Sequence, residues 1–252
     1  MRGAAGHPAS VPVLGDLLLL ALESATSFAS VALLRGGDLL AELTTTGARP
    51  HSERLLPGVD RVLAAAGITL ADVGAFAVSI GPGSFTGLRV GVATLKGLAF
   101  GDERPVAPVP TLAALAASAA ASAHPVVACL DARRGEVYAA AWEPGAAGLA
   151  PLVPEGVFTP DALARAAPRP CTLVGCPGEE AVLESVRDAI GPEARLAEPA
   201  PPRAFFVGRL GRVLLGRGET VAASRLVPRY LRRAEAEARR TGEALEEAGC
   251  SG

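Results

Sequence analysis

Residues 75–97 hold the feature of this sequence that most constrains its fold. The apolar run Ala75–Ile80 is typical of a buried strand. A loop with glycines at positions 81, 83 and 87 follows it, and from Gly87 onward the apolar residues recur at helical spacing. A strand, a glycine loop and a helix in this order let an α/β protein turn its chain sharply, and they can also present backbone N–H groups to an anion.

The loop itself has two interpretations, and the sequence leaves both open. Gly81, Gly83, Ser84 and Thr86 are candidates for a degenerate phosphate loop, because glycines allow a phosphate group to come close to the backbone. The spacing matches neither Gly-x-Gly-x-x-Gly nor a P-loop, since no Gly-Lys-Ser/Thr sequence closes it. The alternative is a tight strand-to-helix turn that needs only glycine.

The helix predicted after this loop is apolar on nearly every side. Glycines at positions 83, 87 and 91 recur at every fourth residue and leave one side of the helix bare. A neighbouring face carries apolar side chains at helical spacing: Leu88, Val92, Leu95 and Ala99. A helix of this kind is covered on more than one side, by its own sheet and by something else, which indicates a partner.

Composition narrows the class of protein. The chain has 252 residues, of which 50% are hydrophobic, enough for a real core and for two lobes. Its net charge is −2 and its aromatic content is 4%, so composition favours neither a polyanion-binding protein nor a stacking platform for single-stranded nucleic acid. The four cysteines form no Cys-x-x-Cys pair, as in a reduced cytosolic protein.

The beginning of the chain predicts neither a membrane segment nor an export signal. The apolar run Leu17–Leu22 is far too short to span a membrane. Residues 1–16 lack the long apolar centre of a signal peptide and contain two prolines. We interpret these residues as an N-terminal extension and expect a cytoplasmic protein without membrane association.

The first part of the chain predicts an antiparallel meander followed by α/β units. Residues 52–66 carry the stripe of an amphipathic helix, with Ser52 as its N-cap. The segments predicted as strands are 17–22, 28–34, 39–45 and 75–80. Together with the helix after the glycine loop they form a β-β-β-α-β-α lobe.

A second stretch repeats this opening pattern. A buried strand at 126–130 leads to Asp131, a polar turn and another strand at 136–142, just as Glu23 follows the first strand. The remaining predicted elements are strands at 106–109 and 172–175 and helices at 111–123, 161–167, 179–190 and 205–215. The fold class is therefore α/β, with two lobes built from a duplicated β-meander plus helices.

We divide the chain into five parts on this basis. The helix at 203–217 is expected to return to the first lobe, and the polar tail is either an exposed helix or disordered. The parts are an N-terminal extension (1–16), a first lobe (17–104), a smaller second lobe (105–202), a closing helix and segment (203–233) and the tail (234–252).

Candidate catalytic groups are few. Glu23 and Asp131 follow buried strands, where two-lobed phosphotransferases place Mg²⁺-binding acids, but hairpin-capping carboxylates are the favoured interpretation. Ser84 resembles a nucleophile, yet Gly-x-Ser-x-Gly is not matched and His51 is its only obvious base. The histidines and cysteines do not cluster, so neither a metal nor a cofactor is expected.

Four motifs stand out together: His51–Pro57, Gly81–Leu98, Asp131–Tyr138 and Pro228–Arg233. They resemble the TsaB (YeaZ) family, which serves threonylcarbamoylation of adenosine 37 in tRNA (t6A). The likeness runs from about residue 17 to residue 237. This resemblance implies a two-lobed fold of the actin/sugar-kinase/Hsp70 type, and Glu23-Ser24-Ala25 stands where the family usually has Asp-Thr-Ser.

The resemblance also implies a non-catalytic subunit. Members of this family pair with the catalytic subunit TsaD and work with the ATPase TsaE, and tRNA is expected to bind only within the complex. TsaD relatives carry a Val-Asn-His-x-Glu-Gly-His metal motif, whereas the corresponding stretch here, Val109–Leu115, has no histidine and no acid. The alternative from another class is an active phosphotransferase or hydrolase of the same fold.

Candidate interface residues follow from the two helices at 52–66 and 85–98. If these helices lie side by side, matching helices of TsaD or of a second copy of this chain can pack on them, with glycine letting the backbones approach. The candidates are Leu56, Val90, Gly87, Gly91 and His51.

Overall fold

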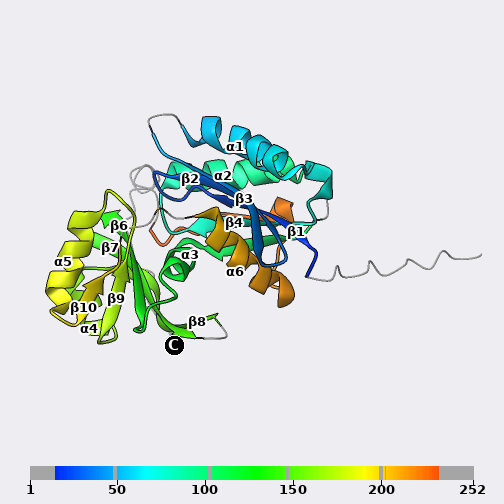
Figure 1. Ribbon diagram of the computed structural model, residues 1–252. Coiled ribbons are helices and arrows are strands. Elements are labelled where there is room, and N and C mark those ends of the chain that lie inside the picture. Colours follow the sequence, from blue (N-terminus) through cyan, green and yellow to red (C-terminus); the bar gives the residue numbers. More distant parts are fainter. Residues whose placement is uncertain are drawn as a thin grey trace, which may run out of the picture.

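The computed structural model describes residues 15–47, 50–101, 104–145, 148–198, 201 and 203–232. They form two lobes, each built around a five-stranded mixed sheet (Figure 1). The predicted N-terminal extension, apart from its last residues, and the polar tail lie outside the described residues. None of the described helices is both long and apolar enough to cross a membrane.

The first sheet is centred on the apolar run that opens the folded chain. In β1 (Leu18–Glu23) every residue after Leu18 is buried, because both faces of the strand are covered. β1 pairs antiparallel with β2 (Ala29–Arg35) and parallel with β4 (Ala75–Gly81). The outer strands are β3 (Asp38–Thr45) beside β2 and β5 (Val106–Pro110) beside β4, which gives the order β3-β2-β1-β4-β5.

Helices cover both faces of this sheet. α1 (His51–Ala66) and α2 (Phe85–Leu98) lie side by side on one face, where Leu55, Val59 and Leu95 enter a common core with Phe76 of β4 (Figure 1). α6 (Ala204–Gly216) covers the other face, where Val207 packs against apolar residues of β1, β2 and β4. The last α-helix of the described residues therefore packs on the first sheet.

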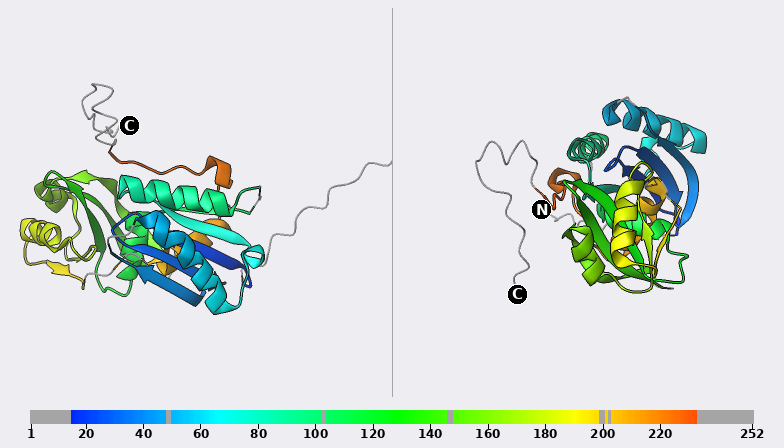
Figure 2. Two further views of the ribbon diagram at one scale, coloured as in Figure 1. Left: turned by 90° about the horizontal axis from the view of Figure 1, so that it is seen from above. Right: turned by 90° about the vertical axis from the view of Figure 1, so that its left-hand side faces the viewer.

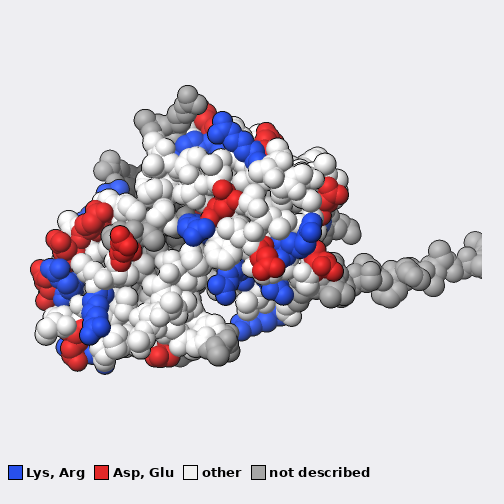
Figure 3. Space-filling model, viewed as in Figure 1, with Lys and Arg blue, Asp and Glu red and all other residues white. Residues whose placement is uncertain are grey.

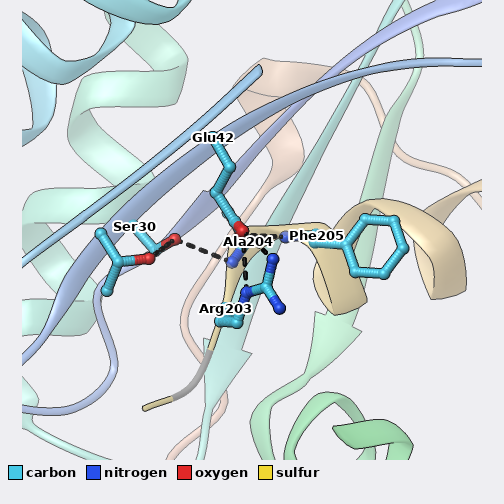
Figure 4. A network of polar contacts seen from close by, with 6 residues as sticks. Ser30, Glu42, Arg203, Ala204 and Phe205 are labelled. Carbon is cyan, nitrogen blue, oxygen red and sulfur yellow. Dashed lines mark hydrogen bonds and ion pairs between the residues drawn. The ribbon is translucent and has the colours of Figure 1, made fainter. Parts of the chain in front are cut away.

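Side chains of the first sheet cap the N-terminus of α6 from far away in the sequence. The helix has no capping side chain of its own, since Arg203 holds the N-cap position. Ser30 Oγ accepts a hydrogen bond from Ala204 N at 3.0 Å, and Glu42 Oε1 accepts one from Phe205 N at 2.9 Å. Glu42 also forms an ion pair with Arg203 (Figure 4). These bonds fix the helix on β2 and β3.

The second sheet repeats the topology of the first. β6 (Val126–Arg133) pairs antiparallel with β7 (Glu136–Gly145) and parallel with β9 (Cys171–Val174). β8 (Gly148–Phe158) and β10 (Ala194–Leu196) complete the order β10-β9-β6-β7-β8, which read from β8 matches the order of the first sheet. The predicted duplication is confirmed, and Glu23 and Asp131 occupy related places in it.

Three helices complete the second lobe. α4 (Pro160–Ala166) and α5 (Glu180–Ile190) cover one face of its sheet, with Leu163, Leu183 and Val186 in the core. α3 (Thr111–Ser118) covers the other face through Leu112 and Leu115, while its Ala114 packs against the α6 side of the first sheet. α3 thus lies between the two lobes (Figure 1).

Several boundaries differ from the sequence-based expectation. β5 belongs to the first sheet, so the lobe boundary after residue 104 was placed one strand too early. β5 lies at the edge of the first sheet, and Val106 exchanges two backbone hydrogen bonds with Val221 of the returning chain. Helix α1 begins one residue earlier than expected, and Ser52 is not its N-cap, because Pro50 takes that position without a side-chain bond.

Two strands and one helix end were also missed. β8 was not predicted because its prolines and polar residues break the period-2 pattern, and β10 is only 3 residues long. The helix expected at 111–123 ends at Ser118. This earlier end was not predicted, because the alanine-rich sequence carries no helix-ending signal there.

Candidate functional site: the cleft between the lobes and the face of α1 and α2

A cleft of about 790 Å³ lies between the two lobes. The first lobe contributes the turn after β1, the start of α1 and the glycine loop, while the second contributes the β6–β7 turn and the start of α5. Residues 229–232 of the closing segment also line it. Both candidate motifs, the glycine loop and the acidic turn with Asp131, therefore meet at one place.

The glycines of the loop are required by the chain itself. A Cβ on Gly83 would lie 2.2 Å from the carbonyl oxygen of Ala25, and one on Gly81 would lie 2.3 Å from the carbonyl oxygen of Arg229. The same construction at Gly87 meets the carbonyl oxygen of Ser24 at 2.0 Å. Close backbone approach within the chain thus accounts for all of these glycines, which supports the tight-turn interpretation.

The hydroxyl groups of the loop serve local structure as well. Ser84 Oγ accepts a hydrogen bond from Gly87 N at 3.2 Å and caps α2, while Ser84 N donates to Ala25 O at 2.6 Å. Thr86 is exposed in the first turn of α2. Ser84 is therefore a helix cap, the role that a loop hydroxyl usually has.

His51 fastens α1 to the turn after β1. Its Nε2 atom lies 2.8 Å from Thr26 O and 3.2 Å from Phe28 O, so the ring carries its proton on Nε2 and donates to both carbonyl oxygens. Burial lowers the pKa of His51, and the nearby guanidinium of Arg54 lowers it further. The ring is committed to this structural role and is not free to activate Ser84.

Glu23, at the end of β1, is fully buried. Its Oε1 atom accepts a hydrogen bond from Ala25 N at 2.6 Å, and its Oε2 atom has no hydrogen-bond partner among the described residues. Burial raises the pKa of Glu23 to about 7, although the hydrogen bond that the carboxylate accepts from Ala25 N opposes the shift. Glu23 therefore closes the β1–β2 turn, which is the hairpin-capping role favoured from the sequence.

Asp131 closes the equivalent turn of the second lobe. Its Oδ1 atom accepts a hydrogen bond from Arg133 N at 2.7 Å, and its carboxylate pairs with the Arg133 side chain. Glu179 Oε2 in turn accepts a hydrogen bond from Asp131 N at 3.2 Å, and burial raises the pKa of Glu179. Among the described residues, no three His, Cys, Asp or Glu side chains gather into a metal-binding group.

The structure places the candidate interface residues on two different sides of the helices. Leu56 of α1 is 49% exposed and Val90 of α2 is half-buried, so both can reach a partner. Gly91 is buried, and a Cβ there would lie 2.2 Å from Ser24 Oγ. The expectation that Gly87 and Gly91 form an outer edge is wrong, because both face the turn after β1.

Other small residues lie on the outer side of α2. Ala93 and Gly97 are exposed, a Cβ on Gly97 would meet no heavy atom of the described residues within 4 Å outside its own helical turn, and Phe100 just beyond the helix is 91% exposed. With Val90 they form a stripe at helical spacing beside α1. The four-residue spacing of Ala93 and Gly97 is visible in the sequence. Gly83, Gly87 and Gly91 form a longer run with the same spacing, so the prediction fell on those glycines instead.

Comparison with known proteins agrees with the resemblance seen in the sequence. A family model described as "TsaD: tRNA N6-adenosine threonylcarbamoyltransferase" matches residues 39–171. The tRNA threonylcarbamoyladenosine biosynthesis protein TsaB of Bacillus subtilis is 30% identical over 233 residues, which cover 88% of this chain and 97% of that protein. The chain belongs to the TsaB family.

Further relatives support this assignment. TsaB of Haemophilus influenzae is 46% identical over 125 residues, 49% of this chain, and the match spans 52% of that protein, about half its length. The solved structure of YeaZ from Pseudomonas aeruginosa is 33% identical and aligns with a TM-score of 0.74 over 85% of this TsaB-family chain and 100% of its own.

More distant structures show the fold alone. The activator of the 2-hydroxyisocaproyl-CoA dehydratase from Clostridium difficile, solved with bound ADPNP, is 7% identical and aligns with a TM-score of 0.50 over 81% of this chain and 97% of its own. Together with the duplicated sheets, this likeness confirms the expected actin/sugar-kinase/Hsp70 fold class.

Proposed function

We propose that this TsaB-family chain is a non-catalytic subunit of t6A biosynthesis that pairs with TsaD for threonylcarbamoylation of tRNA adenosine 37. Its family supports the pathway, since relatives are named tRNA threonylcarbamoyladenosine biosynthesis proteins. The cleft supports the absence of chemistry, because His51, Ser84 and Asp131 are each engaged in closing a turn or a helix end. The hydrogen bonding of these polar groups within the chain is the observation that supports the proposal most directly.

The outer face of α1 and α2 is the proposed docking surface for TsaD. It carries Leu56 of α1 and the stripe Val90, Ala93 and Gly97 of α2, whose short side chains let another helix come close. The same surface can hold a second copy of this chain, so a homodimer would compete with the TsaD complex. Matching helices of TsaD would complete a small helical bundle with an apolar centre.

Substitutions on this face test the proposed pairing. We expect Leu56→Glu and Gly97→Arg each to weaken association with TsaD by about 2–4 kcal/mol, roughly 30- to 1,000-fold in Kd, without lowering the melting temperature. Ser185→Arg, at an exposed position of α5 in the second lobe, is the matched control. Full-strength co-elution of folded Leu56→Glu and Gly97→Arg with TsaD would show that the face is wrong.

Activity assays separate this proposal from the phosphotransferase or hydrolase alternative. The purified chain alone is expected neither to turn over ATP nor to form t6A, whereas TsaD and the ATPase TsaE together with this chain are expected to form it from tRNA and an activated threonylcarbamoyl donor. Formation of t6A with TsaD omitted, or ATP turnover by the chain alone, would favour the alternative. We propose a cytoplasmic location for the protein, in keeping with a role in tRNA modification.

Binding of tRNA is proposed to occur only within the complex. Figure 3 shows Lys and Arg side chains gathered around α6 beside acidic ones, with the two signs interspersed elsewhere on that face. Near the end of the folded chain, Arg229 pairs with Glu155 and Arg232 with Glu136. Arg233 lies outside the described residues. We expect weak, strongly salt-dependent binding of tRNA by the chain alone.

A further inference from the structure

Residues 226–232, which we call the strap, run along the outside of α2 toward the second lobe (Figure 2). The strap is anchored to the first lobe at three points. Leu226 is buried in the core beneath α1 and α2, and Arg229 N donates a hydrogen bond to Ile80 O at 2.7 Å. The Tyr230 ring lies 5.0 Å from the Phe85 ring, and Arg89 Nε donates to Tyr230 Oη at 3.2 Å.

The strap also binds the second lobe, through two arginines. Arg229 forms an ion pair with Glu155 of β8, and Arg232 forms one with Glu136 of β7. Arg232 Nη1 also donates a hydrogen bond to Ala132 O in the β6–β7 turn at 3.0 Å. The side chains of Glu155 and Arg232 are only 11% and 18% exposed, so these pairs are shielded from solvent more than ordinary surface pairs are.

The strap borders the cleft, whereas α3 does not. Arg229, Tyr230, Leu231 and Arg232 line the cleft, and no residue of α3 is among its lining residues. α3 instead packs between the two sheets, with Ala114 toward the first lobe and Leu115 toward the second. Rotation of one lobe against the other about α3 would therefore stretch the strap and break one of its two sets of contacts.

We propose that the strap is a clasp, which sets the angle between the lobes, and that breaking its arginine–glutamate pairs opens the cleft. The hydrogen bond to Ile80 and the contact between the Tyr230 and Phe85 rings hold the clasp on the first lobe. Glu136 and Glu155, which we call the catch, bind it on the second lobe. Because Phe85 lies in the first turn of α2, the clasp also ties this helix to the second lobe.

The test measures the distance between the lobes in the isolated full-length chain. Spin labels are placed at Arg61→Cys on α1 and Ser185→Cys on α5, both exposed, in a Cys250→Ser background. The remaining cysteines are buried and are not expected to react: Cys129, Cys171 and Cys176. Double electron–electron resonance then gives the distribution of label-to-label distances, and circular dichroism verifies that each variant is folded.

Three variants decide the outcome. Arg232→Glu places like charges at the catch and is expected to lengthen the mean distance and broaden its distribution, and adding Glu136→Arg is expected to restore both. Glu136→Gln with Glu155→Gln removes both pairs while leaving the strap sequence intact, so it tests the same idea even if Arg232→Glu does not fold. Arg225→Ala, an exposed arginine just before the strap, is the matched control.

The salt dependence of the label-to-label distance tests the same ion pairs in the wild-type chain, without any substitution at the catch. Raising the ionic strength from about 0.1 M to 1 M shortens the screening length from about 10 Å to about 3 Å, which weakens ion pairs. We expect longer distances at high salt in the wild-type chain and no further change in the Glu136→Gln/Glu155→Gln variant. Wild-type distance distributions in folded Arg232→Glu or in the glutamine variant would overturn the clasp.

Discussion

The hydroxyl of Ser24 donates a hydrogen bond to the carbonyl oxygen of Gly87, with 2.9 Å between the two oxygen atoms. Ser24 lies in the turn after β1 and Gly87 in the first turns of α2, so this bond seats the helix on the centre of its own sheet. Gly91 lies one turn further along and faces the same hydroxyl. The run of glycines is thus a packing feature within the first lobe.

Gly91→Ala is expected to destabilise the protein. The added Cβ would lie 2.2 Å from Ser24 Oγ, so the hydroxyl must move and give up its bond to Gly87 O. We expect a net loss of about 1–2 kcal/mol in urea denaturation, since overpacking outweighs the gain in helix propensity. The double variant Ser24→Ala/Gly91→Ala is expected to lose less than the sum of its single changes.

Gly97→Ala is the matched control on the same helix. Outside its own helical turn, none of the described residues places an atom within 4 Å of the added Cβ, so we expect the substitution to stabilise the protein by up to about 1 kcal/mol. Equal stabilities of Gly91→Ala and Gly97→Ala would contradict the packing described for Ser24.

Glu23→Gln is expected to change how stability depends on pH. Burial raises the pKa of Glu23 from 4.5 to about 7, so the folded state holds the proton more tightly than the unfolded state does. The wild-type protein therefore loses stability as pH rises from 4.5 to about 7, and glutamine has no such loss. Between pH 5 and pH 8 we expect the variant to gain about 2–3 kcal/mol relative to wild type.

Urea denaturation at the two pH values measures this difference. Glu184→Gln, at an exposed position of α5, is the control and is expected to keep the wild-type pH dependence. A constant difference in unfolding free energy between wild type and Glu23→Gln would rule out a raised pKa at Glu23.

Glu42→Ala is expected to loosen α6 from the first sheet. The substitution removes the acceptor for Phe205 N and the ion-pair partner of Arg203, and loss of a helix cap costs about 1–2 kcal/mol. Glu42→Gln keeps an acceptor oxygen, and we expect it to lose clearly less stability. Denaturation followed by circular dichroism compares the two, and equal losses would show that charge, not capping, fixes the helix.

His51 is expected to titrate below its ordinary pKa. Burial and the Arg54 guanidinium both favour the neutral ring that donates to Thr26 O. Because the unfolded state binds this proton more tightly, stability falls as pH drops through 6.5 toward the folded-state pKa. Nuclear magnetic resonance titration of the imidazole, with the signal assigned by means of His51→Gln, measures the pKa of His51. A midpoint above 6.5 would contradict the proposed neutral role.

Most elements of the fold followed from local patterns. The buried runs that became β1, β4 and β6, the amphipathic stripe of α1 and the repeated acidic turn were all visible in the sequence, because burial leaves a periodic apolar signature. β8 carried no such signature, since its exposed edge tolerates proline and polar residues.

Less of the candidate site could be predicted from the sequence. Gly91 and Gly97 look alike in the sequence, yet one packs on Ser24 and the other faces solvent. Likewise, Arg229 and Arg232 lie three residues apart in the sequence, and only the fold places Glu155 and Glu136 beside them. Such pairs join segments far apart in the chain, and sequence periodicity holds no information on them.

The sequence by itself determined the α/β class, the duplication marked by Glu23 and Asp131, and the family, because each rests on local order and residue identity. The tertiary structure alone decided which side of α2 is open, what Ser84 and His51 bind, and that the strap joins the lobes. The physical reason is that a helix or a strand forms from neighbours in the chain, whereas burial of a given glycine or pairing of a given charge depends on which distant segment packs against it.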